Sequence, residues 1–430
     1  MKRLLLTTII VLISFAQAQA QAETVSFTVS GIKVIFKPTT KNVINIRIYY
    51  RGGVNNYAET QAGIENLALD ATTQCGTKKY SANAFRDTAD KYGVYIYGRS
   101  TYDYGFIQVN CISKYFEKGW DLFSEAVTDP VFDAGQVELI KSKQISYISR
   151  KQANAQNQLF EVQMKNAFAK TAYAVSPDGT EQTIAGLTAD GLNAYYKTLL
   201  NKNRIFIVVV GNVKKEDLYE KILLAFDNIR SAPYTDPVMT APLWNDNKLL
   251  SEEQQVKTNY VSAIMNAPAF TSEDYVPFRL AVSGLGGNLY SYLRSVQNLT
   301  YDPSSSVRAL KMPFTTVYAS STNPQQVMFG IMKVLKSVQT NGYNDEWLQH
   351  IKNGYITNSY INDQSAAQIT DNLGSAEILG NWHFADDLPR LVNMVTVDQL
   401  NAVINNYIKG LRWNYVGNLD IIEGFKVPKY

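Results

Sequence analysis

The chain contains very little histidine. Two of its 430 residues are histidines, His350 and His383, and they lie 33 positions apart. Enzymes that hold zinc on one helix place two histidines one turn apart, so that both imidazoles lie on the same helical face. The composition therefore excludes such a histidine pair anywhere in this sequence.

Cysteine is equally scarce, with Cys75 and Cys111 as the two thiols of the chain. In an oxidising compartment they could form one disulfide, and two separate buried thiols are the alternative. A disulfide requires a short distance between the two Cα atoms, which the sequence does not give. Both states therefore remain open at this point.

The chain also lacks a strong charge. It has 41 basic and 38 acidic residues, interspersed, for a net charge of +3. Proteins that bind nucleic acid or anionic membranes usually carry a concentrated basic surface. We therefore expect no nucleic-acid partner and no polybasic membrane patch. With 46% hydrophobic residues the chain can bury a large core, and its length suggests two or more domains.

The first 22 residues have the pattern of an export signal. Lys2 and Arg3 precede an apolar run from Leu4 to Phe15, and an Ala-Gln repeat with A-x-A cleavage sites follows at residues 16–22. The apolar run is shorter than the roughly 20 residues that a membrane-spanning helix needs. A retained anchor is the alternative. We predict signal removal at residues 1–22, no membrane span afterwards, and a periplasmic or secreted mature protein.

The most informative segment is residues 63–80, GIENLALDATTQCGTKKY. Its apolar positions predict a helix of about three turns, which Gly76 and Thr77 end. A strand-like run at residues 43–51, the pair Gly52 and Gly53, and then Glu59 precede it.

This order of strand, Gly-Gly, Glu, Gly, apolar helix and Gly-Thr resembles the pitrilysin/insulinase family of zinc peptidases, the inverzincins. In active members the helix reads H-x-x-E-H, in which two imidazoles hold zinc and the glutamate activates the metal-bound water. Counted from Gly63, the matching positions here are Asn66, Leu69 and Asp70. Counted back from Gly76 and Thr77, they are Leu67, Asp70 and Ala71. Neither register contains a histidine.

The resemblance places a third zinc ligand, a glutamate, at about residues 144–147. No acidic residue occurs between Leu139 and Phe160. Since a protein zinc site needs at least three protein donors, we expect no metal and no catalytic residue on this chain. Asn66 and Asp70, four positions apart, could bind a weak ion, although an ordinary polar stripe is the simpler interpretation.

The second half of the chain repeats the pattern of the first. The segment LTADGLNA at residues 187–194, followed by IVVVGN at 207–212, is echoed by VTVDQLNA at 395–402 and WNYVGN at 413–418. The offsets are 208 between Thr188 and Thr396, 206 between Gly211 and Gly417, and 211 between Phe132 and Tyr343. Consistent offsets at similar elements indicate a duplicated unit of about two hundred residues.

The predicted domains are therefore an N-terminal peptidase-like domain at residues 23–230 and a C-terminal one at 246–430. Three prolines and little apolar periodicity mark residues 231–245 as a linker. The first domain should contain a long helix from about residue 133 to 158. The fold class we expect is α+β, and the resemblance implies two homologous domains, each a mainly antiparallel sheet with helices on one face.

A second family signature occurs at GLGGNLYSYLR, residues 284–294. In the family, a glycine-rich turn enters a helix that ends in Leu-Arg, and a tyrosine follows seven residues after the arginine. Arg294 and Tyr301 keep that spacing. The resemblance implies that both bind substrate backbone and that the phenol supports a developing oxyanion. The alternative is that Arg294 caps a helix while Tyr301 packs. A phosphate loop is disfavoured because the Gly-Lys-Ser/Thr ending is missing.

Three functional hypotheses follow. The first is a catalytically silent subunit, expected to form a heterodimer with a homologous chain that carries the zinc, with peptides or unfolded polypeptides as ligands. A homodimer is not excluded. The second is a non-catalytic peptide-binding or scaffold protein of the cell envelope. The third is an autonomous metallopeptidase with an unusual site at Glu65, Asp70 or Asp103, although carboxylates alone favour hard ions over zinc.

Overall fold

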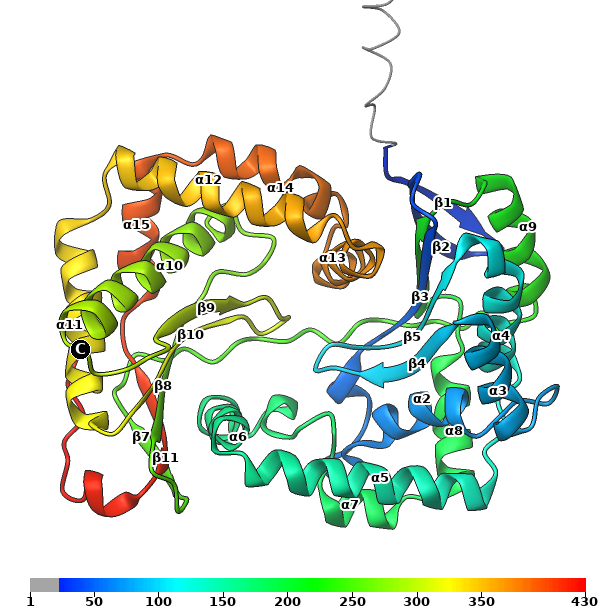
Figure 1. Ribbon diagram of the computed structural model, residues 1–430, viewed down its shortest axis with the longest axis horizontal. Coiled ribbons are helices and arrows are strands. Elements are labelled where there is room, and N and C mark those ends of the chain that lie inside the picture. Colours follow the sequence, from blue (N-terminus) through cyan, green and yellow to red (C-terminus); the bar gives the residue numbers. More distant parts are fainter. Residues whose placement is uncertain (1–22) are drawn as a thin grey trace, which may run out of the picture.

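The computed structural model describes residues 23–430, so the predicted signal at residues 1–22 lies outside the described part of the chain. The described residues form two halves, each with one sheet at its centre and helices around it (Figure 1). The α+β fold with two similar domains is therefore confirmed.

The first half contains a six-stranded sheet with the order β1-β2-β6-β3-β5-β4, antiparallel except where β2 pairs with β6. Its strands are β1 (Val25–Val29), β2 (Ile32–Pro38), β3 (Val43–Arg51), β4 (Tyr95–Ser100), β5 (Tyr104–Ile112) and β6 (Ile205–Gly211). Its helices are α2 (Ile64–Gln74), α3 (Ala82–Tyr92), α4 (Phe116–Thr128), α5 (Ala134–Ala153), α6 (Ala155–Phe168), α7 (Glu181–Gly186), α8 (Ala189–Leu199) and α9 (Lys215–Phe226).

The second half contains a five-stranded sheet with the order β7-β11-β8-β10-β9, antiparallel except where β7 pairs with β11. Its strands are β7 (Leu249–Glu253), β8 (Asn259–Met265), β9 (Ser304–Arg308), β10 (Phe314–Ser321) and β11 (Arg412–Gly417). Its helices are α10 (Tyr275–Leu289), α11 (Pro324–Asn341), α12 (Asp345–Asn362), α13 (Ala366–Leu379), α14 (His383–Met394) and α15 (Val397–Tyr407).

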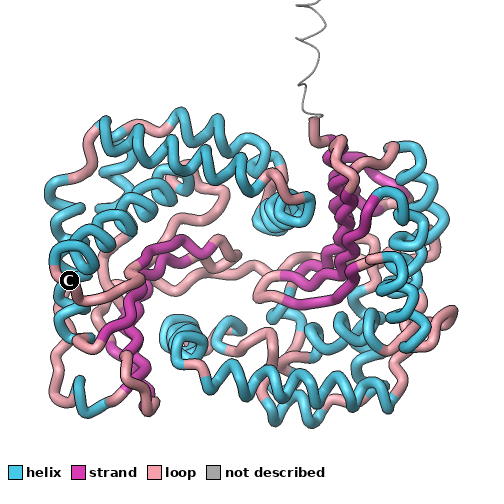
Figure 2. The backbone as a smooth tube through the Cα atoms, in the orientation of Figure 1, coloured by secondary structure: helices cyan, strands magenta, loops and turns pink. Residues whose placement is uncertain are grey.

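The repeated segments occupy equivalent places in the two halves. Thr188 caps α8 by accepting a hydrogen bond from the Gly191 N–H, and Thr396 caps α15 in the same way from the Gln399 N–H. Helix α8 leads into β6 and helix α15 into β11. Each of these strands belongs to the one parallel strand pair of its sheet, β2 with β6 or β7 with β11. The duplication predicted from the sequence is thus visible in the structure (Figure 2).

The long helix predicted for residues 133–158 is interrupted, so that prediction was wrong. Asn154 has an extended backbone between α5 and α6, and its side chain accepts a hydrogen bond from the Asn157 N–H. An asparagine side chain competes well for backbone donors and favours a new helix start over continuation. The same break recurs in the second half, where Ser365 caps α13 shortly after α12 ends.

This break lets each half place one helix on the sheet of the other. Helix α13 packs on the face of the first sheet opposite α2, and α6 packs on the second sheet (Figure 1). The apolar contact under α13 joins Ile369 and Leu373 to Tyr49, Phe206 and Val208 of the sheet. Each sheet therefore has helices of its own half on one face and a helix of the other half on the second face.

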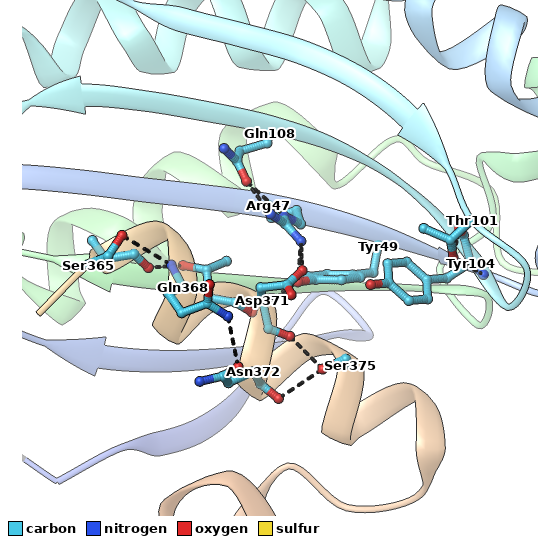
Figure 3. A network of polar contacts seen from close by, with 12 residues as sticks. Arg47, Tyr49, Thr101, Tyr104, Gln108, Ser365, Gln368, Asp371, Asn372 and Ser375 are labelled. Carbon is cyan, nitrogen blue, oxygen red and sulfur yellow. Dashed lines mark hydrogen bonds and ion pairs between the residues drawn. The ribbon is translucent and has the colours of Figure 1, made fainter. Parts of the chain in front are cut away.

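Polar contacts reinforce the contact between α13 and the first sheet (Figure 3). The Arg47 guanidinium pairs with Asp371 at 2.5 Å and donates to Gln108, while the Tyr49 hydroxyl donates to the Thr370 carbonyl at 2.9 Å. Gly374 lies directly on the Tyr49 ring, because a Cβ atom there would lie 2.0 Å from the ring carbon Cζ. The two halves are thus joined by close packing and by buried polar groups.

A second charged group lies at the end of the same helix. Glu377 accepts hydrogen bonds from Lys33 at 2.8 Å and from Arg51 at 3.0 Å, and Lys37 pairs with Asp386 at 2.9 Å. In each pair the cation belongs to the first sheet and the carboxylate to the second half. The interface therefore has complementary charges.

The two cysteines are both buried and free in the structure. Burial raises the pKa of Cys75 to about 12 and that of Cys111 to about 11. The structure thus describes two separate thiols.

Candidate functional site

Helix α2 carries the positions at which the resemblance places the zinc motif. Gly63 caps its start with a positive φ of 90°, and an ideal Cβ at Gly63 would lie 2.5 Å from Ile184. The helix spans 11 residues to Gln74, and its C-cap Cys75 stands directly before Gly76, which has φ 88°. The predicted three-turn helix and its glycine stop are therefore present.

Asn66 occupies the first ligand position, and its side chain is already engaged. Its Oδ1 accepts a hydrogen bond from the Ser100 N–H of β4 at 3.0 Å, and both residues are buried. A histidine at this position would direct an imidazole toward the edge of the sheet. The amide instead fastens α2 to β4.

Leu69 occupies the position of the catalytic glutamate and is fully buried. It lies over the β4–β5 hairpin, where an ideal Cβ at Gly98 would lie 2.1 Å from the Leu69 carbonyl oxygen and one at Gly105 2.4 Å from Leu69 Cδ1. The two glycines allow α2 to approach the sheet this closely. In the second register, Leu67 and Ala71 are core residues with no donor atom in their side chains.

Asp70 occurs in both registers: it occupies the second ligand position in the first register and the position of the catalytic glutamate in the second. Burial raises its pKa to about 6, although the nearby Lys143 favours the charged form. Asp70 is thus the one oxygen donor among the three motif positions that could carry a negative charge. A single carboxylate does not make a zinc site.

Gln144 lies at the start of the range expected for the third ligand. Its Nε2 donates a hydrogen bond to the Asp178 carbonyl at 2.9 Å, so the amide ties α5 to the segment before α7. Within residues 23–430 no group of three His, Cys, Asp or Glu side chains is arranged to hold a metal ion.

Glu65 is a structural residue of this site whose role the sequence analysis missed. It is completely buried in the first turn of α2 and accepts hydrogen bonds from the Tyr195 hydroxyl at 2.6 Å, Asn56 at 2.9 Å and Ser100 at 2.9 Å. Burial raises its pKa, while the hydrogen bonds oppose this shift. Glu65 therefore ties α2 to α8, to the loop after β3 and to β4. An acidic residue in the first turn of a mostly apolar helix was the available signal.

Asp103, the third carboxylate considered, belongs to the contact between the two halves. It accepts hydrogen bonds from the Tyr173 hydroxyl and from the Lys311 N–H, the latter at 2.9 Å. Burial raises its pKa. These hydrogen bonds stabilise the contact between the two halves. Asp103 does not form a metal-binding group with Glu65 and Asp70.

Arg294 and Tyr301 lie together on the surface of the second half. The guanidinium carbon of Arg294 is 4.6 Å from the centre of the Tyr301 ring, and Arg294 also donates to Asn298 at 3.2 Å. Tyr301 is 76% exposed. The structure thus brings the two residues together and leaves the ring accessible.

The glycine-rich segment before Arg294 is not a turn, contrary to the prediction. Gly284, Gly286 and Gly287 lie inside α10, which continues as a π-helical stretch at Tyr290–Val296. An ideal Cβ at Gly284 would lie 2.9 Å from Tyr343. One at Gly286 would lie 3.0 Å from Ser305, and one at Gly287 would lie 3.0 Å from Trp347. The glycines therefore serve close packing of α10 against β9 and α12, and tertiary contacts outweigh their low helix propensity.

Strand β4 lies next to the motif helix at the edge of the first sheet. It pairs with β5 on one side, and no other strand within residues 23–430 pairs with its second side. The edge of a sheet offers unpaired backbone N–H and C=O groups to an added strand. The outward-facing backbone groups of β4 therefore lie beside the motif helix.

Two family profiles match the chain. One described as "Insulinase (Peptidase family M16)" matches residues 33–180, and one described as "Peptidase M16 inactive domain" matches residues 186–355. The chain belongs to the M16 peptidase family. It is a member without the zinc motif, because the positions on α2 contain Asn66, Leu69 and Asp70.

Similar proteins include some whose names describe no peptidase. The chain is 21% identical over 282 residues to the mouse "Cytochrome b-c1 complex subunit 1, mitochondrial". It is 19% identical over 377 residues to the "Non-peptidase homolog YmxG" of Helicobacter pylori, covering 85% of each chain. The match covers 64% of this chain but spans only 58% of the length of the mouse protein.

Solved structures share the fold. A Pseudomonas fluorescens structure described as a peptidase M16 inactive domain has a TM-score of 0.84 and 18% identity, covering 92% of this chain and 98% of that one. The similarity extends over both halves. Among the described residues, no helix has both the length and the apolar character needed to cross a membrane.

Proposed function

We propose that this M16 homologue is a non-catalytic subunit of the periplasm or the extracellular space. It pairs with a homologous zinc-bearing chain and contributes to peptide binding in a chamber shared by the two. The observation that carries this proposal is the state of α2, which is kept in full while its ligand positions hold Asn66, Leu69 and Asp70. A protein that needed its own zinc would not lose these donors.

The free edge of β4 supports peptide binding. A peptide in extended conformation could add to β4 as a further strand and gain backbone hydrogen bonds without sequence-specific contacts. The motif helix lies directly beside this strand, as the bond between Asn66 and Ser100 shows. The free edge of β4 beside a motif helix without zinc ligands therefore supports a role in holding a peptide rather than cleaving it.

The exposure of Arg294 and Tyr301 supports a role toward another molecule. The ring is 76% exposed, so it contributes little to the core of its own half. A guanidinium supported by a ring is well suited to bind carbonyl oxygens, and the phenol can donate one hydrogen bond. We propose that this pair binds peptide backbone on the side of the partner's zinc.

The test is to purify the mature chain with its associated proteins from its source and to identify them by mass spectrometry. The proposal requires a co-purifying chain with H-x-x-E-H and cleavage of an unfolded polypeptide by the complex. The double variant Arg294→Ala/Tyr301→Ala should retain the complex and lose most of the cleavage. A matched variant, Arg390→Ala/Tyr219→Ala, removes an exposed arginine and an exposed tyrosine elsewhere and should leave cleavage unchanged.

A scaffold role is the second candidate, favoured by the name of the mouse relative as a subunit of a multi-chain complex. Under that role the complex forms, it cleaves nothing, and Arg294→Ala/Tyr301→Ala changes no activity. The autonomous metallopeptidase receives no support, since Glu65 and Asp103 are engaged in structural hydrogen bonds.

A further inference from the structure

We propose that the face of β4 that carries Tyr95, Tyr97 and Arg99 selects the peptide, and that it favours acidic and aromatic side chains. This inference rests on the proposed peptide-binding function and specifies its ligand. The three residues occupy alternate positions along the strand, so their side chains point to the same face of the sheet. We call these three side chains the row.

The aromatic part of this row is accessible. The Tyr95 side chain is 63% exposed, and its ring centre lies 5.2 Å from that of Tyr97. Tyr97 in turn contacts Phe106 of β5 at 5.6 Å. Phe106 belongs to the cluster under α13, so the row begins where the interface between the two halves ends. An exposed tyrosine in contact with a half-buried one, beside a free strand edge, is suited to stack on an apolar or aromatic side chain.

The charge of the row is positive and uncompensated. Arg99 is exposed and forms no ion pair with any residue of the described range. Arg47, on the same face, is paired with Asp371 of α13, which is the carboxylate that faces the row from the opposite half. A carboxylate of a bound peptide could therefore pair with Arg99 without displacing an acidic residue of this chain.

The hydrogen-bond pattern fixes the register of an added strand. The Thr101 N–H donates to the Tyr104 carbonyl in the β4–β5 turn, and the Ser100 N–H points away from β5 to Asn66. Backbone groups in antiparallel pairs alternate in direction, so those of Ile96 and Gly98 also point outward. Since Asn66 already occupies the Ser100 N–H, a peptide can pair with Ile96 and Gly98.

In that register, alternate peptide side chains lie beside Tyr95, Tyr97 and Arg99. Neighbouring side chains on one face of a sheet are about 5 Å apart, within reach of an ion pair or an aromatic contact. A peptide antiparallel to β4 would place an acidic residue beside Arg99 and aromatic residues two and four positions later. The preferred pattern is therefore acidic-x-aromatic-x-aromatic.

The probe is a fluorescein-labelled octapeptide, Thr-Asp-Thr-Tyr-Thr-Phe-Thr-Thr, with a second peptide in which lysine replaces aspartate. Their binding to the mature chain is measured by fluorescence polarisation. We expect the aspartate peptide to bind up to about fivefold more tightly than the lysine peptide, since one cross-strand contact contributes up to about 1 kcal/mol. The variant Arg99→Glu should reverse this preference. The matched variant Arg86→Glu, exposed on α3, should keep it.

Two further measurements separate strand addition from general charge attraction. Methylation of the peptide nitrogens that face β4 should abolish binding, while methylation of the alternate nitrogens should not. Tyr95→Ala should weaken binding of the aspartate peptide and leave an otherwise identical peptide with threonine in place of both aromatic residues unaffected.

Equal binding of the two peptides, or an unchanged preference in Arg99→Glu, would overturn this inference. Such a result would leave the proposed function standing if cleavage by the complex still depended on Arg294 and Tyr301. Absence of any zinc-bearing partner and of any cleavage would instead remove the proposed function itself.

Discussion

The side chain of Asn66 accepts a hydrogen bond from the backbone N–H of Ser100, so the first ligand position of the motif is bonded to the edge strand. The distance between Asn66 Oδ1 and Ser100 N is 3.0 Å, and both residues are buried. The residue at the position of a metal ligand thus holds α2 against β4.

The variant Asn66→Ala should therefore destabilise the protein. It leaves the Ser100 N–H buried without a partner, which costs about 1–3 kcal/mol. Urea unfolding followed by circular dichroism measures this loss. The control Asn83→Ala, at an exposed position of α3, should change the free energy of unfolding by less than about 0.5 kcal/mol. Equal effects of the two variants would show that the Asn66 bond is unimportant.

Much of the fold could be predicted from the sequence because it depends on local signals. The capping residues Thr188 and Thr396 and the glycine after α2 act within a few residues of their own positions. The loss of zinc donors is likewise a matter of residue identity. These features need no knowledge of distant contacts.

The remaining features depend on contacts between distant segments. The sequence of the α10 glycines predicts a turn. They are helical because Tyr343 and Trp347, which lie more than 50 residues later, pack closely against them. Glu65 looks like one more helix carboxylate until Tyr195, which lies 130 positions later, donates to it. The packing of α13 on the opposite sheet has no local signal, because its partners lie far earlier in the sequence: Tyr49, for example, lies 321 positions before Thr370.

The contact between Gly374 and Tyr49 predicts a large effect for a small substitution. Gly374→Ala adds a Cβ atom that would lie 2.0 Å from Tyr49 Cζ, so α13 or the ring must move. We expect a loss of about 1–3 kcal/mol, together with faster limited proteolysis between the two halves. Gly354→Ala in α12 is the control, since an added Cβ there meets nothing within 4 Å. It should be neutral or stabilising by up to about 1 kcal/mol. A neutral Gly374→Ala would contradict close packing of α13.

Asp70 should make stability depend on pH. Burial raises its pKa to about 6 in the folded protein, above the ordinary value of 3.8. The folded state then binds the proton more tightly than the unfolded state, so the contribution of Asp70 to stability decreases as pH rises from about 4 to about 6. Asp70→Asn should therefore stabilise the protein at pH 7, by about 3 kcal/mol at most, and have little effect at pH 4. Urea unfolding of both proteins at the two pH values tests this, and an equal difference at both would refute it.

The two thiols should be unreactive in the folded protein. Burial raises the pKa of Cys75 to about 12 and that of Cys111 to about 11, so few thiolates exist at neutral pH. Maleimide should label neither residue in buffer and both in urea, as measured by intact mass spectrometry. An unlabelled protein in urea, with a mass corresponding to the loss of two hydrogens, would demonstrate a disulfide instead.

The most direct test of the central claim is the zinc content of the purified mature protein, measured by elemental mass spectrometry after dialysis without chelator. Because Asn66, Leu69 and Asp70 provide too few donors, we expect less than about a tenth of an equivalent of zinc per chain. Close to one equivalent would contradict the account, and the chain would then have to be assayed as a peptidase in its own right.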